Sequence, residues 1–123
     1  MPASDAGLPS HATTIMTLPN GDRAIVDIRK LKDYCLNPHH SRGRNKARVF
    51  ASLGIREGDA NELRALLKAA AEGEARLGMW NQYGQRYVID FDLVCRGKSA
   101  RIRSTWIILT GQDLPRLTTC YVL

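Results

Sequence analysis

The sequence predicts an α+β domain in which two or three N-terminal helices pack on an antiparallel sheet of three or four strands. Three observations predict this class. Apolar residues recur at helical spacing between residues 28 and 73. From Gln85 onward, apolar and polar residues alternate, as in strands that bury one face. The chain of 123 residues, with 44% hydrophobic and 24% charged side chains, has the size and composition of one globular domain.

The beginning of the chain is expected to contain a leader followed by a β-hairpin. Residues 1–13 are rich in Ala, Ser, Pro and Gly and are predicted to form a flexible leader, with a single domain over residues 14–123. Two β-favouring runs, residues 14–18 and 23–26, flank an Asn-Gly dipeptide that is typical of tight hairpin turns. The sequence therefore predicts an early hairpin that could join the sheet.

Two helices are predicted next. Asp27 can cap the first, over residues 28–36, which ends before Pro38 because a residue that precedes proline avoids the α region. The second is expected over residues 45–53, with Gly54 as its stop.

The third predicted helix begins at Asp59 and ends near Gly73. Asp59 as N-cap and Glu62 three residues later have the spacing of a capping box. Apolar residues at helical spacing follow it: Leu63, Leu66, Leu67 and Ala70.

Three strands are predicted over residues 87–94, 100–109 and 116–122, with a turn at residues 95–98 between the first two. The side chains expected to face the core are Tyr87, Ile89, Phe91, Leu93, Ile102, Trp106 and Ile108. On the opposite face, a hairpin register would place Asp90 and Asp92 against Arg101 and Arg103 as cross-strand ion pairs. The alternative is that the two carboxylates bind a divalent metal, but no third acidic ligand lies nearby.

Charge and cysteine content limit the classes of function. A net charge of +6 and an isoelectric point near 9.6 favour a polyanionic partner, either nucleic acid or an acidic protein. Cys35, Cys95 and Cys120 form no CxxC pair, which indicates reduced thiols, with Cys35 and Cys120 in the core. Without a signal peptide or an apolar run long enough to cross a membrane, the chain is expected to be cytoplasmic and to use no cofactor.

The segment over residues 36–50 has the composition of a phosphate-binding site. Two adjacent histidines, His39 and His40, can exchange a proton near neutral pH. The four cations that follow them can hold an anion: Arg42, Arg44, Lys46 and Arg48. A metal-independent ribonuclease needs a base for the 2′-hydroxyl, an acid for the leaving 5′-oxygen and cations for the charged transition state. The histidines match the first two roles, and Lys46, Arg48 and Arg103 match the third.

The alternative is structural. Histidines after an Asn-Pro turn are often solvated, and one of the pair at most would face a site. Trp80 and Tyr83 are expected in a loop, where they could stack on bases, whereas Tyr87 and Trp106 are expected in the core.

The chain also resembles an uncharacterised bacterial family of small domains of unknown function, from Leu18 to the last residue. The matching residues are Leu36, Asn37, Pro38, His40, Gly43, Lys46, Ala47, Phe50, Tyr83 to Tyr87, Asp90, Ala100, Arg103, Trp106, Ile107, Pro115 to Leu117, and Thr119 to Tyr121. The family looks like toxin-type domains that occur beside small partner proteins. Its order of helices and then sheet is similar to the barnase, EndoU, colicin and RelE group of ribonuclease toxins, which is an analogy of fold.

This resemblance implies roles for particular residues. Its H-x-x-G spacing selects His40 as general base or acid, with His39 second. Lys46 and Arg103 would stabilise phosphate charge, and the further residues implied or expected to bind substrate are Arg42, Arg48, Arg116, Thr119 and Tyr121.

Two functions are therefore expected. One is a metal-independent ribonuclease-like toxin of a toxin–antitoxin or polymorphic-toxin system, which acts on RNA and is inhibited by a small acidic antitoxin or immunity-type protein. The other is a non-catalytic module that binds nucleic acid or a partner through the same basic segment.

Overall fold

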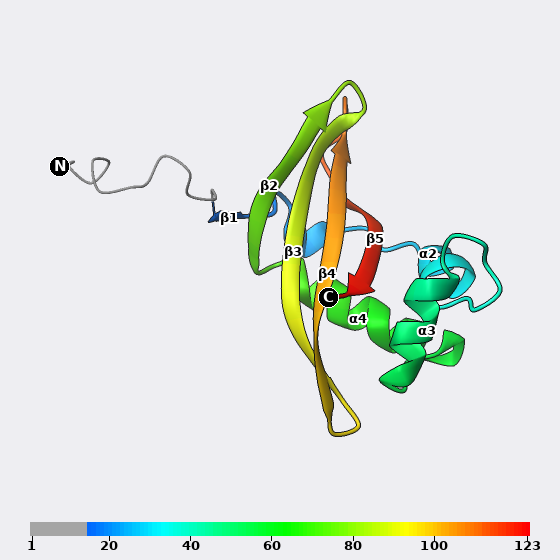
Figure 1. Cartoon of the computed structure of the whole chain (residues 1–123). Coiled ribbons are helices and arrows are strands. Elements are labelled where there is room, and N and C mark those ends of the chain that lie inside the picture. The colour runs from blue at the N-terminus through cyan, green and yellow to red at the C-terminus, as the bar shows by residue number, and fades with distance from the viewer. Residues whose placement is uncertain (1–14) are drawn as a thin grey trace.

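A computed structural model describes residues 15–123 and has the predicted α+β architecture (Figure 1). The helices lie on one side of a five-stranded antiparallel sheet with the order β1-β2-β3-β4-β5. The sheet thus has more strands than the three or four expected. Its strands are β1 Ile15–Thr17, β2 Glu74–Asn81, β3 Gly84–Cys95, β4 Lys98–Leu109 and β5 Arg116–Val122. The predicted leader, residues 1–13, lies outside the described residues.

The helical segments all lie between β1 and β2 in the chain. They are the 3₁₀ helix η1 Gly21–Arg23, α2 Ile28–Lys30, the π-helical turn η2 Leu31–Cys35, α3 Arg44–Ser52, the 3₁₀ helix η3 Glu57–Asp59 and α4 Ala60–Ala70. The first predicted helix is thus split into α2 and η2. The wide turn of η2 is formed by the hydrogen bond that the Leu36 nitrogen donates to the Leu31 oxygen at 2.8 Å. Asp27 caps α2 as predicted, because its Oδ1 accepts from the Arg29 nitrogen at 3.0 Å.

The ends of α3 and α4 follow from local hydrogen bonds. Gly54 stops α3 as predicted, with a φ of +88° that glycine adopts readily. Asp59 precedes α4, but its carboxylate accepts from the Arg56 nitrogen at 2.9 Å and does not cap α4. The predicted capping box with Glu62 is therefore wrong, because the preceding η3 turn uses the Asp59 side chain.

The predicted early hairpin is also wrong. Strand β1 pairs with the beginning of β2, and the segment after it forms η1 instead of a return strand. Gly21 packs so closely on Ala71 that an added Cβ would lie 2.1 Å from the Ala71 oxygen. The chain then passes the end of the sheet, where Ile25 makes a single parallel bridge to Arg116.

The long β3–β4 hairpin agrees with the prediction. Its turn has Arg96 and Gly97 in left-handed conformations, at φ of 50° and 82°. The register pairs Asp90 with Arg103 and Asp92 with Arg101, which confirms the cross-strand ion pairs on the face away from the helices.

The core lies between the sheet and the helices. Tyr87, Ile89, Leu93, Ile102 and Trp106 are buried as predicted. Three polar groups in this core are satisfied together. Trp106 Nε1 donates to the Ser104 hydroxyl at 2.9 Å, and that hydroxyl donates to the Ile89 oxygen at 2.8 Å.

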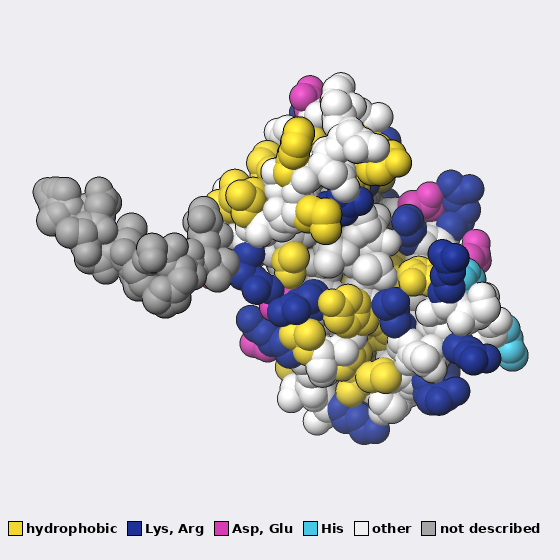
Figure 2. Space-filling view, turned by 45° about the horizontal axis from the view of Figure 1, so that its top comes forward, with side chains coloured by type: hydrophobic (Ala, Val, Ile, Leu, Met, Phe, Trp, Pro, Cys, Tyr) yellow, Lys and Arg dark blue, Asp and Glu magenta, His cyan; other side chains and the backbone are white. Residues whose placement is uncertain are grey.

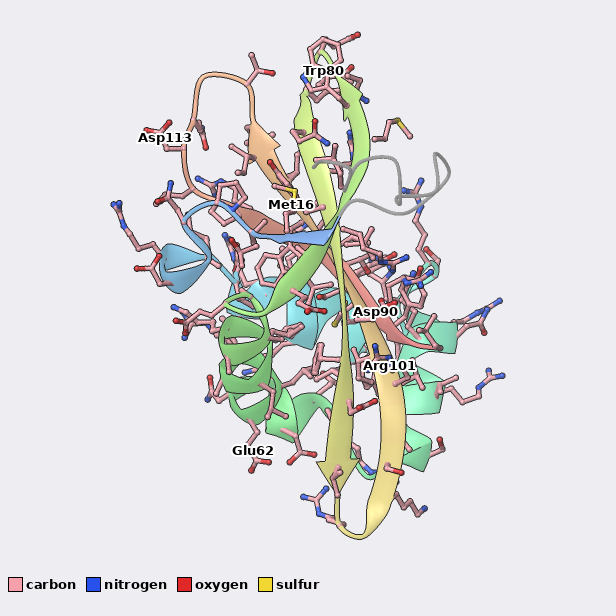
Figure 3. All side chains as sticks on the ribbon, turned by 90° about the vertical axis from the view of Figure 1, so that its left-hand side faces the viewer. Met16, Glu62, Trp80, Asp90, Arg101 and Asp113 are labelled. Atoms are coloured by element: carbon pink, nitrogen blue, oxygen red, sulfur yellow. The ribbon has the colours of Figure 1, made fainter. Side chains whose placement is uncertain are left out.

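Strand β2 was not expected from the sequence. Trp80, predicted in a loop, lies on this strand, with 71% of its surface exposed, and Tyr83 lies in the turn that follows. Figure 3 shows Trp80 at the end of the sheet that projects beyond the helices.

Candidate functional site

The basic segment lies on the α2 and α3 side of the molecule and has no acidic residue between Asp33 and Glu57. Among residues 15–123, the ion pairs involve none of the four cations Arg42, Arg44, Lys46 and Arg48. Figure 2 shows Lys and Arg side chains gathered around the histidines on this side. The positive charge is therefore available to a ligand.

Lys46 lies at the centre of this region, in the first turn of α3. Its Nζ donates to the hydroxyl of Tyr34 at 3.1 Å and lies 5.1 Å from the centroid of that ring. The same nitrogen lies 5.8 Å from the centroid of the Tyr121 ring on β5. Two aromatic rings from different elements thus hold the ammonium group in place by cation–π contacts.

His40 also contacts Tyr34, with the two rings edge to face and their centroids 4.9 Å apart. Its Nδ1 accepts from the backbone nitrogens of Arg42, at 3.0 Å, and Gly43, at 3.1 Å. Because both partners are donors, the proton of the neutral ring lies on Nε2. In this position His40 holds the turn that leads into α3, and its Nε2 is not used by these two hydrogen bonds.

A glycine is needed at position 43, three residues after His40, because the loop passes very close to the backbone of Tyr34 there. A Cβ at this position would lie 2.1 Å from the backbone oxygen of Tyr34. The loop can therefore approach η2 only where a side chain is absent. This close approach brings His40 against Tyr34.

Arg103 connects the sheet to the same region. It binds Asp90 through two hydrogen bonds, Nε to Oδ1 at 2.8 Å and Nη2 to Oδ2 at 2.9 Å, and Arg76 binds Oδ2 of the same carboxylate at 2.9 Å. The pKa of Asp90 is lowered, chiefly by Arg103. The pKa of Arg103 is raised, first by Asp90 and also by the hydroxyl of Tyr121, its neighbour on β5.

The structure therefore brings together four of the residues predicted for the site. These residues and Tyr34 are hereafter called the Lys46 cluster: Tyr34, His40, Lys46, Arg103 and Tyr121. They come from η2, the loop before α3, α3 itself, β4 and β5. Sequence reasoning missed Tyr34, since a tyrosine inside a predicted helix carries no signal for a site.

Arg42 lies at the edge of a shallow depression of about 610 Å³ beside the Lys46 cluster. The side chains that line it are Asp27, Arg29, Lys30, Asp33, Tyr34, His40 and Arg42. The Asp27 carboxylate is already bound by Arg29 at 2.8 Å. This surface could hold one phosphate group next to His40.

The other predicted residues lie elsewhere. His39 is exposed, and its backbone nitrogen donates to Asn37 Oδ1 in the Asn-Pro turn at 2.9 Å. Arg48 lines a separate groove of α3, and Arg116 lies at the opposite end of β5 from Tyr121. Thr119 lies with its hydroxyl 3.8 Å from the buried thiol of Cys35.

The alternative metal site at Asp90 and Asp92 is occupied by cations of the protein. Arg103 and Arg76 bind Asp90, and Arg101 binds Asp92 at 3.0 Å. Within residues 15–123, no three His, Cys, Asp or Glu side chains lie close enough together to hold a metal ion.

Fold and site together define a small basic α+β domain with an ordered, unpaired lysine between two aromatic rings. Residues 17–123 match a family described as Domain of unknown function (DUF6883), and the chain belongs to this family. The resemblance to an uncharacterised family is thereby confirmed, and its toxin-type function stays a prediction. No curated protein and no solved structure matches the chain. None of the helices within residues 15–123 is long and apolar enough to span a membrane.

Proposed function

We propose that this domain binds the phosphate backbone of RNA at the Lys46 cluster and cleaves it without a metal, as a toxin-type ribonuclease. The observation that carries the proposal is the position of the Lys46 ammonium group, which lies between Tyr34 and Tyr121 and forms an ion pair with no carboxylate of residues 15–123. A fixed cation of this kind favours the extra negative charge of a phosphorane over that of the ground-state phosphate.

The reaction would be attack of the 2′-oxygen on phosphorus, with loss of the 2′-hydroxyl proton to water and departure of the 5′-oxygen, which leaves a 2′,3′-cyclic phosphate. Lys46 and Arg103 would stabilise the phosphorane. The Tyr34 hydroxyl accepts from Lys46 and keeps its own proton, which it could give to the leaving oxygen. His40 would donate from Nε2 to a phosphate oxygen, since the backbone already occupies its Nδ1.

The geometry of His40 also favours a second candidate function, which is binding of RNA without cleavage. A histidine that exchanges protons must at some stage protonate both ring nitrogens, and two backbone donors oppose a proton on Nδ1. In either case a small acidic antitoxin or immunity-type protein would cover the same cations, because its carboxylates would take the positions of phosphates.

The test is inducible expression of the wild type, Lys46→Ala and Lys68→Ala in bacteria, with growth and total RNA followed together. Lys68, in the last turn of α4, supplies a matched loss of one charge away from the site. We expect growth arrest and RNA fragments with 2′,3′-cyclic ends from the wild type and Lys68→Ala, but not from folded Lys46→Ala. Intact RNA from soluble wild type, combined with salt-dependent RNA binding in vitro, would favour the second function.

A further inference from the structure

A second depression, of about 380 Å³, borders the Lys46 cluster between α3 and the end of β5. Figure 1 shows these two elements next to each other. The side chains that line the depression are Asn45, Lys46, Val49, Tyr121 and Val122. Its volume lies in the range of small-molecule sites, which begins at roughly 300 Å³. Lys46 and Tyr121 also belong to the Lys46 cluster, so a ligand in this depression lies directly beside the proposed phosphate site.

The walls of this depression suit a flat, apolar group. Val49 has 43% of its surface exposed on α3, and Val122, near the end of β5, is half-buried. The Tyr121 side chain is also half-buried, so that part of it stays accessible. Aromatic rings stack on the bases of single-stranded RNA, and apolar side chains extend the contact with the faces of those bases. A nucleobase therefore fits the apolar part of the depression.

Asn45 supplies the polar group of the depression that is not already used. It is exposed in the first turn of α3. Among residues 15–123, the asparagine side chains that form hydrogen bonds are those of Asn20, Asn37 and Asn81, so the amide of Asn45 is free for a ligand. A side-chain amide presents an acceptor and a donor next to each other. It therefore selects a base edge on which a donor lies beside an acceptor.

We propose that this depression receives the base of the nucleotide whose phosphate binds Lys46, and that Asn45 makes adenine the preferred base. Among the four RNA bases, only adenine offers a donor beside an acceptor at both its Watson–Crick and its Hoogsteen edge, because its N6 amino group lies next to N1 and next to N7. Asparagine is accordingly a typical bidentate partner of adenine. This inference rests on the binding of phosphate at Lys46, which is part of the proposed function, and not on cleavage.

The chain offers a matched control for Asn45. Asn61 is also exposed, and each of the two is the second residue of its helix, α3 or α4. Asn61 lines a different depression, together with Lys32 and Glu57. Alanine is the best helix former, so the replacement of either asparagine by alanine should leave the domain folded.

The experiment titrates inorganic phosphate and the four nucleoside monophosphates into the isotope-labelled full chain and follows the backbone and side-chain amide signals by NMR. Each nucleotide is used with its phosphate at the 3′ and at the 5′ position. We expect AMP, in at least one of these two series, to bind about tenfold more tightly than the other three nucleotides, as one bidentate contact provides. It should also shift the side-chain amide signal that is missing from the spectrum of Asn45→Ala.

The variants separate the base from the phosphate. Asn45→Ala should reduce the preference for AMP to about twofold or less, which is what stacking alone provides, and should bind inorganic phosphate as the wild type does. Asn61→Ala should keep the full preference. Lys46→Ala should weaken the binding of inorganic phosphate and of all four nucleotides, because it removes the cation that they share.

The possible failures can be told apart. Equal affinities for the four nucleotides, or a preference for AMP that survives in Asn45→Ala, would overturn the role of Asn45 and leave the phosphate site at Lys46 intact. A preference for another base that Asn45→Ala removes would overturn the choice of adenine. No binding of inorganic phosphate, of any nucleotide or of RNA would overturn the proposed function as well.

Discussion

The Nζ of Lys46 donates a hydrogen bond of 3.1 Å to the hydroxyl of Tyr34. This bond joins α3 to η2 and fixes the direction of the ammonium group. It also turns the phenol into an acceptor, so that the phenol's own proton is free for another partner. The ammonium group of Lys46 and the hydroxyl group of Tyr34 are thus positioned by the same contact.

Replacing Tyr34 by Phe removes the hydroxyl and keeps the ring, so that their contributions can be measured separately. We expect RNA cleavage to fall about 100-fold, because a general acid contributes roughly that much or more, while RNA affinity changes about twofold or less because the ring and Lys46 remain. Single-turnover cleavage and fluorescence anisotropy measure the two effects. Tyr83→Phe, at the exposed hairpin end, is the control and should change neither. Equal losses of affinity and rate in Tyr34→Phe would contradict the role of the proton.

The two histidines should differ in their effect on stability. His40→Ala removes the acceptor of two backbone N–H groups and should lower the free energy of unfolding by about 0.5–1.5 kcal/mol, the usual net contribution of a hydrogen bond. His39→Ala should leave it within about 0.5 kcal/mol, because its side chain is exposed. Urea unfolding at pH 8 compares them, and equal stabilities would show that the His40 ring does not stabilise the turn before α3.

Gly43→Ala tests the close approach of the loop to η2. The new methyl group would meet the Tyr34 backbone oxygen, so we expect a loss of about 1–3 kcal/mol in the free energy of unfolding. Gly58→Ala is the matched control, since nothing lies within 4 Å of the added Cβ. Thermal unfolding of both variants provides the comparison. A Gly43→Ala domain as stable as Gly58→Ala would mean that the loop is held elsewhere.

The pH dependence of stability should report the ion pair of Asp90 with Arg103. The folded pKa of Asp90 is lowered, so its contribution is complete above the unfolded pKa of about 3.9 and disappears as the pH falls through the folded value. Asp90→Asn should therefore destabilise the domain by about 1–2 kcal/mol at pH 7 and progressively less below about pH 4. Asp92→Asn, whose carboxylate is 76% exposed, should have little effect at any pH. If the loss in free energy of unfolding caused by Asp90→Asn were the same at pH 7 and at about pH 2, the charge of the Asp90 carboxylate would be excluded as its cause.

The lowered pKa of the Cys35 thiol gives a spectroscopic prediction. The absorbance of thiolates near 240 nm should rise with a midpoint at pH about 6, because the pKa of Cys35 is lowered to that value, and this rise should be absent in Cys35→Ser. Cys120→Ala removes the main cause of the lowered pKa and should move the midpoint upward. Cys95→Ser should keep the midpoint of the wild type, and a shift there instead would assign the signal to the wrong thiol.

The parts of the fold that were predictable are those with a regular pattern. The β3–β4 hairpin alternates without interruption, and its ion pairs followed from the position of the turn. The sequence of β2 has no such pattern, because Gly78 lies in its centre and its register shifts between Leu77 and Trp80. The Asn-Gly dipeptide led to the wrong prediction of an early hairpin. Gly21 is instead required by its close contact with Ala71 at the end of α4, which the local sequence does not reveal.

The site was predictable in composition but not in arrangement. The two histidines, Lys46 and Arg103 could be chosen by chemistry, whereas the choice of His40 over His39 and the choice of Tyr121 came from the family resemblance. The fold brings His40, Lys46, Arg103 and Tyr121 together. Tyr34 could not, since its position depends on the π-helical turn η2. The direction of the His40 ring depends on backbone donors, which a sequence does not display.

The most direct test of the Lys46 cluster uses a short RNA with a label at each end and a version with one 2′-deoxy position at the main cleavage site. Purified wild type, Lys46→Met and Lys68→Met would be incubated with both in EDTA, and the products identified by mass spectrometry. We expect a 2′,3′-cyclic phosphate product from the wild type and Lys68→Met, at least about 100-fold less from Lys46→Met, and no cleavage at the deoxy position. Intact RNA with the wild type, or equal cleavage by Lys46→Met, would contradict it.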